Sequence, residues 1–150
     1  MVGSARACCL VMGLVIGALP AREAQAIAFP EPIDHLAVMR DLLALPRPKS
    51  CDAARADLTS LQMQVCAAHA FREADAALNR AYGLAVKEGS PEHREKLRTA
   101  QRAWLAYRDA ECAWESGRYE GGTLAPVTYG QCLVDLTRAR VEAIEAAMKP

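Results

Sequence analysis

Three long stretches of the chain repeat their apolar residues every three or four positions, with helix-breaking segments between them. These stretches cover residues 58–88, 91–116 and 131–148. This spacing places apolar side chains on one face of an α-helix, so it predicts three amphipathic helices. Strand-like alternation is weak throughout. Because short connections favour antiparallel neighbours, the sequence predicts an all-α, up-down-up three-helix bundle.

Capping residues mark where the first two helices begin. Thr59 and Gln62 have the spacing of a capping box, in which each side chain bonds the backbone of the other residue. Ser90 is placed to cap the second helix, and Pro91 follows in the first turn, where a missing N–H costs little. The connection between these two helices is therefore expected to be short.

The segment "GRYEGGTLAPVTYG", residues 117–130, has a different composition from the helices on either side. It contains four glycines and a proline. Such a segment is typical of a long ordered loop, so we expect the third helix to begin only near residue 131.

The first 26 residues have the layout of a secretory signal peptide. Arg6 precedes an apolar run over residues 7–19, and Ala24-Gln25-Ala26 provides a small-x-small cleavage site. We expect cleavage after Ala26 and a periplasmic or secreted protein. The apolar run is short for a membrane span, and no later stretch is long and apolar enough to form one. A lipid anchor on Cys8 or Cys9 is the alternative.

A proline-rich extension over residues 27–50 separates this leader from the main domain, residues 51–150. Between Pro32 and Pro46, "IDHLAVMRDLLAL" predicts a short amphipathic helix capped by Asp34. The following "PRPKS" is typical of a stiff linker, because proline fixes φ and blocks a helix.

Charge and composition argue against several classes of function. Removal of residues 1–26, which hold Arg6, Arg22 and Glu23, lowers the 18 basic and 18 acidic residues to 16 and 17. This balance does not predict a nucleic-acid partner or an anionic membrane surface. The chain has no G-x-S-x-G elbow and no phosphate-binding glycine loop. We therefore expect neither an enzyme nor a cofactor.

Four cysteines remain after the leader: Cys51, Cys66, Cys112 and Cys132. An even number of cysteines in a small exported domain predicts two disulfides. An up-down-up bundle brings three of these cysteines to one end, so local pairing of Cys51 with Cys66 and Cys112 with Cys132 is favoured, although crossed pairings also satisfy the topology. A metal site is the alternative, since Cys66 and His69 lie one helical turn apart, but no second Cys/His pair accompanies them.

Polar side chains also lie among the apolar positions of the first two helices. They are Asp75, Asn79, Gln101, Arg108 and Asp109. Buried charges require partners, so we expect Arg108 to bridge to Asp75, with Asn79 or Gln101 completing the network. The alternative is that Arg108 and Asp75 flank the core and contact water. Trp104 and Tyr107 are expected to pack inside the bundle, whereas Trp114 is as well placed for binding as for packing.

Ordered motifs along the chain resemble those of the LprI-type lysozyme inhibitor N-terminal domain family. They occur in "QMQVCAAHAFREADAALNRAYGLAV", "LRTAQRAWLAYRDAECAWES" and "EGGTLAPVTYGQCLVDLTRARVEAIE". The resemblance covers residues 51–148 and leaves residues 27–50 outside. The matching positions are Cys51, Gln62, Cys66, Asp75, Asn79, Tyr82, Gln101, Trp104, Arg108, Asp109, Cys112, Gly121, Gly122, Cys132 and Arg140.

The resemblance implies a small exported helical domain that binds and inhibits a host or environmental lysozyme and protects the cell wall, with a c-type lysozyme as the candidate partner. A rigid loop can cover an enzyme cleft at low entropic cost, and tyrosine is a favoured hot-spot residue. The segment of residues 117–130 is therefore the candidate partner-binding loop, unless it is a plain connector. Its candidate contact residues are Tyr119, Glu120, Gly121, Gly122, Thr123, Leu124 and Tyr129. The alternative function is a non-inhibitory interaction or structural module of the envelope.

Overall fold

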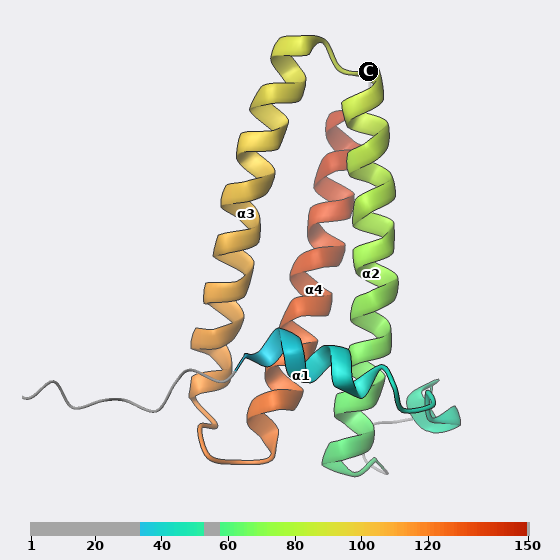
Figure 1. Cartoon of the computed structure of the whole chain (residues 1–150), viewed down its shortest axis with the longest axis vertical. Helices are drawn as coiled ribbons and strands as arrows, with labels where there is room; N and C mark the ends of the chain where they lie inside the picture. The colour runs from blue at the N-terminus through green and yellow to red at the C-terminus, as the bar shows by residue number, and fades with distance from the viewer. Residues whose placement is uncertain (1–33, 53–57, 150) are drawn as a thin grey trace, which may run out of the picture. The chain divides into compact units, whose positions relative to one another are not determined.

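The computed structural model describes residues 34–52 and 58–149, and within these ranges the secondary structure is helical, with no strand. Three long helices, α2 (Ser60–Glu88), α3 (Pro91–Gly117) and α4 (Leu124–Ala147), run up, down and up (Figure 1). The short helix α1 (His35–Leu42) and the 3-10 turn η1 (Lys49–Asp52) precede them. The all-α bundle is therefore confirmed. Within the described ranges, no helix has both the length and the apolar character that crossing a membrane requires.

The predicted caps form as expected. The Thr59 hydroxyl accepts from the Gln62 backbone N–H at 3.2 Å, while the Thr59 N–H donates to Gln62 Oε1 at 2.9 Å. The Ser90 hydroxyl accepts from the His93 N–H at 3.2 Å, directly before Pro91 in the first turn of α3. Asp34 caps α1 by accepting from the Ala37 N–H at 3.0 Å. Each cap satisfies a backbone donor that has no partner inside the helix.

The expected long loop is wrong, because α4 begins at Leu124 rather than near residue 131. Pro126 is the third residue of this helix, where its missing N–H breaks no intrahelical hydrogen bond. Gly130 lies inside the helix and is buried, with its hydrogen facing α2 and α1. The connection between α3 and α4 is consequently limited to residues 118–123.

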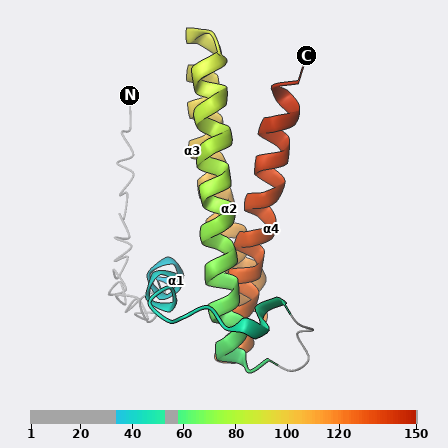
Figure 2. The ribbon, with the colours of Figure 1, turned by 90° about the vertical axis from the view of Figure 1, so that its right-hand side faces the viewer.

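Helix α4 is the common partner of the other two long helices. It packs along both α2 and α3, whereas α2 and α3 have few contacts with each other (Figures 1 and 2). One apolar cluster joins the helices toward the C-terminal end of α4; its buried members are Leu78, Ala81, Ala85 and Ile144. A second lies toward the α3–α4 connection; its buried members are Met39, Leu42, Val65, Ala67, Ala68, Cys112, Tyr129, Cys132 and Leu133.

Helix α1 contributes to this second cluster. Met39 and Leu42 are buried there, and α1 contacts both α2 and α4. In Figure 1 the helix crosses the lower part of the gap between α2 and α3. His69 of α2 extends this attachment, because its Nε2 lies 3.1 Å from the carbonyl oxygen of Leu45. Part of the proline-rich extension is thus integrated into the core of the bundle.

Gly130 marks the closest approach of α4 to α2 and α1, and an alanine there is expected to destabilise the fold. Its Cβ would lie 2.9 Å from Ala67 Cβ and 3.2 Å from Met39 Cε. We expect Gly130→Ala to lower the free energy of unfolding by about 1–2 kcal/mol, measured by urea unfolding. Gly83→Ala is the matched control, because nothing lies within 4 Å of its Cβ. It should raise stability by about 0.5–1 kcal/mol. Equal stabilisation by both changes would contradict the close packing.

Candidate functional site

Two disulfides hold the chain around the α3–α4 connection and the start of α2. Cys112 pairs with Cys132, and Cys51 pairs with Cys66, with Cα–Cα distances of 5.5 and 5.4 Å. The predicted local pairing is therefore confirmed. Cys112 and Cys132 are buried in the apolar cluster, and they join α3 to α4 on either side of residues 118–123. This crosslink restricts how far the two ends of the connection can move apart.

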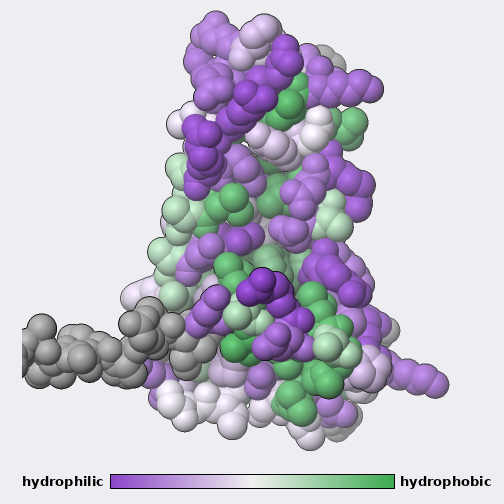
Figure 3. Space-filling view, viewed as in Figure 1, coloured by the Kyte–Doolittle hydropathy of each residue, from purple (hydrophilic) through white to green (hydrophobic). Residues whose placement is uncertain are grey.

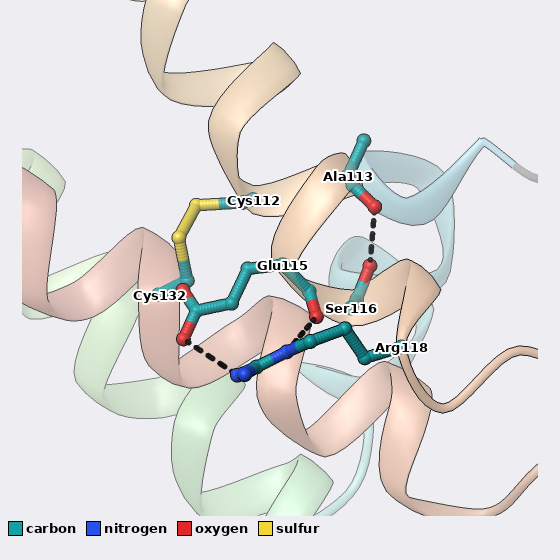
Figure 4. A network of polar contacts seen from close by, with 6 residues as sticks. All are labelled: Cys112, Ala113, Glu115, Ser116, Arg118 and Cys132. Atoms are coloured by element: carbon teal, nitrogen blue, oxygen red, sulfur yellow. Dashed lines mark hydrogen bonds and ion pairs between the residues drawn. A yellow bond between two sulfur atoms is a disulfide. The ribbon is translucent and has the colours of Figure 1, made fainter.

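Local polar contacts fix the last turn of α3 where the connection begins (Figure 4). The buried Ser116 hydroxyl donates to the Ala113 carbonyl oxygen at 3.1 Å. Arg118 turns back along α3, where Nε donates to the Glu115 carbonyl oxygen at 3.4 Å and Nη2 lies 3.8 Å from the Glu115 carboxylate. Gly121 then adopts φ +76°, a conformation that glycine reaches without steric cost. The turn is therefore defined by its own residues as well as by the disulfide.

The exposed residues of this turn, together with the exposed first residue of α4, form the candidate site, which we call the loop surface. It consists of Tyr119, Glu120, Gly121, Gly122, Thr123 and Leu124. Tyr119 and Leu124 are 41% and 46% exposed, and the Arg118 guanidinium lies over the Tyr119 ring, 5.8 Å from its centroid. Ser60, at the start of α2, donates to the Thr123 hydroxyl at 3.4 Å, which brings the exposed Leu61 into the same neighbourhood. Tyr119, Leu124 and Leu61 are therefore exposed apolar side chains at or beside the turn.

Tyr129, the remaining predicted contact residue, does not belong to this surface. It lies in α4 and is only 4% exposed, so its assignment to the binding loop is wrong. Burial raises the pKa of the Tyr129 phenol above its ordinary value, and the nearby Asp109 carboxylate raises it further. The phenol is therefore a neutral core group.

An acidic groove between α3 and α4 adjoins the disulfide. Its volume is about 310 Å³, and it is lined by Glu111 and Glu115 from α3 and by Asp135 from α4. Tyr107 lines the same groove and is 52% exposed, so its predicted place inside the bundle is wrong. Trp114, also on α3, is 71% exposed. Exposed tyrosine and tryptophan are typical of protein-binding surfaces.

The pattern of buried residues along α3 explains why Tyr107 is exposed rather than inside the bundle. The buried residues of this helix are Arg108, Cys112 and Ser116, which repeat every four positions. The buried face therefore follows the cysteine that pairs with α4 rather than the large apolar residues. Cys112 must face Cys132 to form the disulfide, and this requirement is the sequence signal that could have predicted which face of α3 is buried.

The predicted single polar network is also wrong, because its members form three separate contacts. Asp75 accepts from Asn79 Nδ2 at 3.0 Å along α2. Arg108 Nη2 lies 2.7 Å from its neighbour Asp109. Gln101 Oε1 instead accepts from Arg140 Nε at 3.1 Å and links α3 to α4.

Arg108 is held between two aromatic rings. Its guanidinium carbon lies 5.3 Å from the centroid of Phe71 and 5.4 Å from that of Trp104, and Arg140 lies over Trp104 at 5.8 Å. These distances allow cation–π attraction. The stack joins residues of α2, α3 and α4, so Trp104 serves as a packing residue, as expected. Phe71 is the member that the sequence did not indicate.

Cys66 and His69, the pair considered for a metal, have other partners. Cys66 is in a disulfide. The two ring nitrogens of His69 lie 3.1 Å from the Leu45 carbonyl oxygen and 3.1 Å from Arg72 Nη2. Both residues therefore connect parts of the fold.

The fold and the loop surface together define a small, disulfide-bonded helical module with the features of a protein-binding domain. The chain belongs to the LprI family, since residues 51–144 match the family model described as lysozyme inhibitor LprI. It is also similar to an uncharacterized protein, R02472, of Rhizobium meliloti (strain 1021). The two are 31% identical over 108 residues, which cover 63% of this chain and 78% of the relative. No solved structure matches the chain.

Proposed function

We propose that this protein is exported and binds a c-type lysozyme through the loop surface, thereby inhibiting hydrolysis of the cell wall. The supporting observation is the exposed loop surface, in which Tyr119 lies in the turn of residues 118–123 and Leu124 begins α4, between two cysteines crosslinked in the core. Membership of the LprI family supports a protein partner of this kind. Export follows from the predicted signal peptide and agrees with the use of two disulfides.

In the proposed complex, the turn blocks the carboxylate-lined cleft of the lysozyme. A turn that is already ordered loses little conformational entropy on binding, so more of its contact energy contributes to affinity. Tyr119 and Leu124 supply the apolar contact, and the acidic groove of α3 and α4 attracts a basic enzyme surface. Inhibition then requires no chemistry by the module, only exclusion of the polysaccharide substrate.

The test is the rate at which a c-type lysozyme clears a bacterial wall suspension, with and without the purified mature protein. We expect the clearing rate to fall in proportion to the fraction of lysozyme that is bound by the protein. Tyr119→Ala/Glu120→Ala should raise the concentration needed for half-maximal inhibition by at least about tenfold, which corresponds to about 1.4 kcal/mol of binding free energy.

The matched control is Leu84→Ala/Glu88→Ala, which removes an exposed apolar residue and an exposed acid near the opposite end of α2. This variant should inhibit as well as the parent. Equal inhibition by the Tyr119/Glu120 variant would exclude the loop surface. An unchanged clearing rate at high molar excess of the parent would instead favour the alternative, a non-inhibitory interaction module of the envelope.

A further inference from the structure

The gap between α2 and α3 has two parts, of which α1 covers only the lower one (Figure 1). Beyond the part that α1 crosses, the two helices border a cleft of about 470 Å³, within the size range of ligand-binding clefts. Each wall presents residues at positions i, i+4 and i+7 of its helix. They are Asp75, Asn79 and Tyr82 on α2 and Arg98, Arg102 and Leu105 on α3.

The lower part of this gap already holds a short amphipathic helix. Helix α1 has eight residues and reaches α4 through the gap by burying Met39 and Leu42. The spacing between α2 and α3 therefore admits the apolar face of a crossing helix. Because α2 and α3 each pack on α4, the gap continues beyond α1 with the same two helices as walls.

The cleft has an apolar floor. Leu78 lies at the base, Tyr82 is half-buried, and Leu105 is 37% exposed. Figure 3 shows the same face, on which hydrophobic residues are interspersed with hydrophilic ones in the upper half. An occupant would remove the exposed surface of Tyr82 and Leu105 from water, whereas Leu78 is already buried.

The α3 wall is basic. Arg94, Arg98 and Arg102 repeat every four residues, and Arg98 and Arg102 line the cleft. The ion pair of Arg98 with Glu95 is long, at 3.4 Å, and exposed. Among the described residues, the buried Nε of Arg94 has no hydrogen-bond partner. On the opposite wall, Asp75 already accepts from Asn79. The charged side chains that line the cleft are two guanidinium groups and one carboxylate, so the lining has a net positive charge.

We propose that this upper part of the gap binds a short amphipathic helix of another protein. Its apolar face covers Leu78, Tyr82 and Leu105, and its acidic residues face Arg98 and Arg102. Such binding follows the helix-in-groove mode, in which residues at i, i+3, i+4 and i+7 supply the contacts. This second site lies apart from the loop surface and does not depend on inhibition of lysozyme.

The experiment uses two blocked ten-residue peptides with the full mature protein, uniformly labelled with ¹⁵N. Both peptides carry leucine at i, i+3, i+4 and i+7; the other positions are glutamate in one and lysine in the other. We expect the glutamate peptide to shift backbone amide signals of residues 75–82 and 98–105 saturably. Its dissociation constant should be in the range of about 0.1–1 mM, and the lysine peptide should bind at least about tenfold more weakly.

Arg98→Gln/Arg102→Gln should weaken binding of the glutamate peptide at least about fivefold, whereas Arg80→Gln, at an exposed arginine of α2 outside the cleft, should leave it unchanged. Both arginines of the double variant are exposed, so the fold should be retained. Shifts centred on Met39 and Leu42 would mean that the peptide displaces α1, which would overturn the proposal. Equal binding of the two peptides, or no saturable shift in the cleft, would overturn it as well.

Discussion

Replacement of Cys112 and Cys132 by alanine is expected to lower the free energy of unfolding by about 3–4 kcal/mol. The chain-entropy model assigns about 3 kcal/mol to a crosslink that closes a loop of this length. The remainder arises because both cysteines are buried, Cys112 completely, and smaller side chains leave a cavity in the cluster around Leu133. Urea unfolding followed by far-ultraviolet circular dichroism measures this change.

The control removes the other disulfide with Cys51→Ala/Cys66→Ala. The Cys51–Cys66 disulfide closes a slightly shorter loop, and both of its cysteines are only partly buried. Its removal should therefore lower the free energy of unfolding by less, about 2–3 kcal/mol. If the loop surface binds lysozyme, loss of Cys112–Cys132 should also weaken inhibition more than loss of Cys51–Cys66 does. Equal losses of stability and inhibition in the two variants would mean that the buried disulfide has no special relation to the turn.

Arg108→Ala is expected to lower the free energy of unfolding by about 3 kcal/mol, the second largest effect. Arg108 is 5% exposed, and its side chain fills the space between Phe71 and Trp104. Truncation removes two cation–π contacts and the aliphatic stem, leaves a cavity among three helices and removes the partner of Asp109. The Asp109 side chain is 39% exposed, so water solvates its carboxylate in the variant, and the loss of the ion pair adds little to the destabilisation.

Arg108→Lys separates charge from shape. Lysine retains the positive charge near Asp109 but lacks the planar group that stacks between the rings, so about half of the stability should be recovered. Arg80→Ala, at an exposed arginine of α2, should change stability by less than about 0.5 kcal/mol. A change at Arg108→Ala as small as that at Arg80→Ala would show that the stack contributes little.

The helices, their caps and the cysteine pairs were predictable because each depends on local signals. Thr59 with Gln62 and Ser90 with Pro91 satisfy backbone donors within one helical turn. The up-down-up order then brought Cys112 near Cys132. The start of the α3–α4 connection after Gly117 was predictable, and so was the exposure of Tyr119 and Leu124, but the end of the connection at residue 123 was not.

The features that depend on packing between helices were not predictable in the same way. Pro126 and Gly130 indicate a loop by composition, but the first lies in the first turn of α4 and the second allows close approach of α2. Arg108 is buried because Phe71 and Trp104 from two helices enclose it, a relation that no local spacing shows. Tyr107 and Trp114 are exposed because α3 packs on α4 with the face that carries Cys112, not with the face that carries these two aromatic residues.

The position of α4 as the common partner of α2 and α3 has a consequence for how the chain acquires its structure. When the protein is synthesised, α2 and α3 emerge before the helix on which both pack. Until residues 124–147 are available, Cys112 lacks its native partner and the apolar faces of α2 and α3 lack the helix with which they make most of their contacts. Stable folding and formation of the Cys112–Cys132 bond therefore await the last part of the domain, so the native core is completed only when α4 packs between α2 and α3.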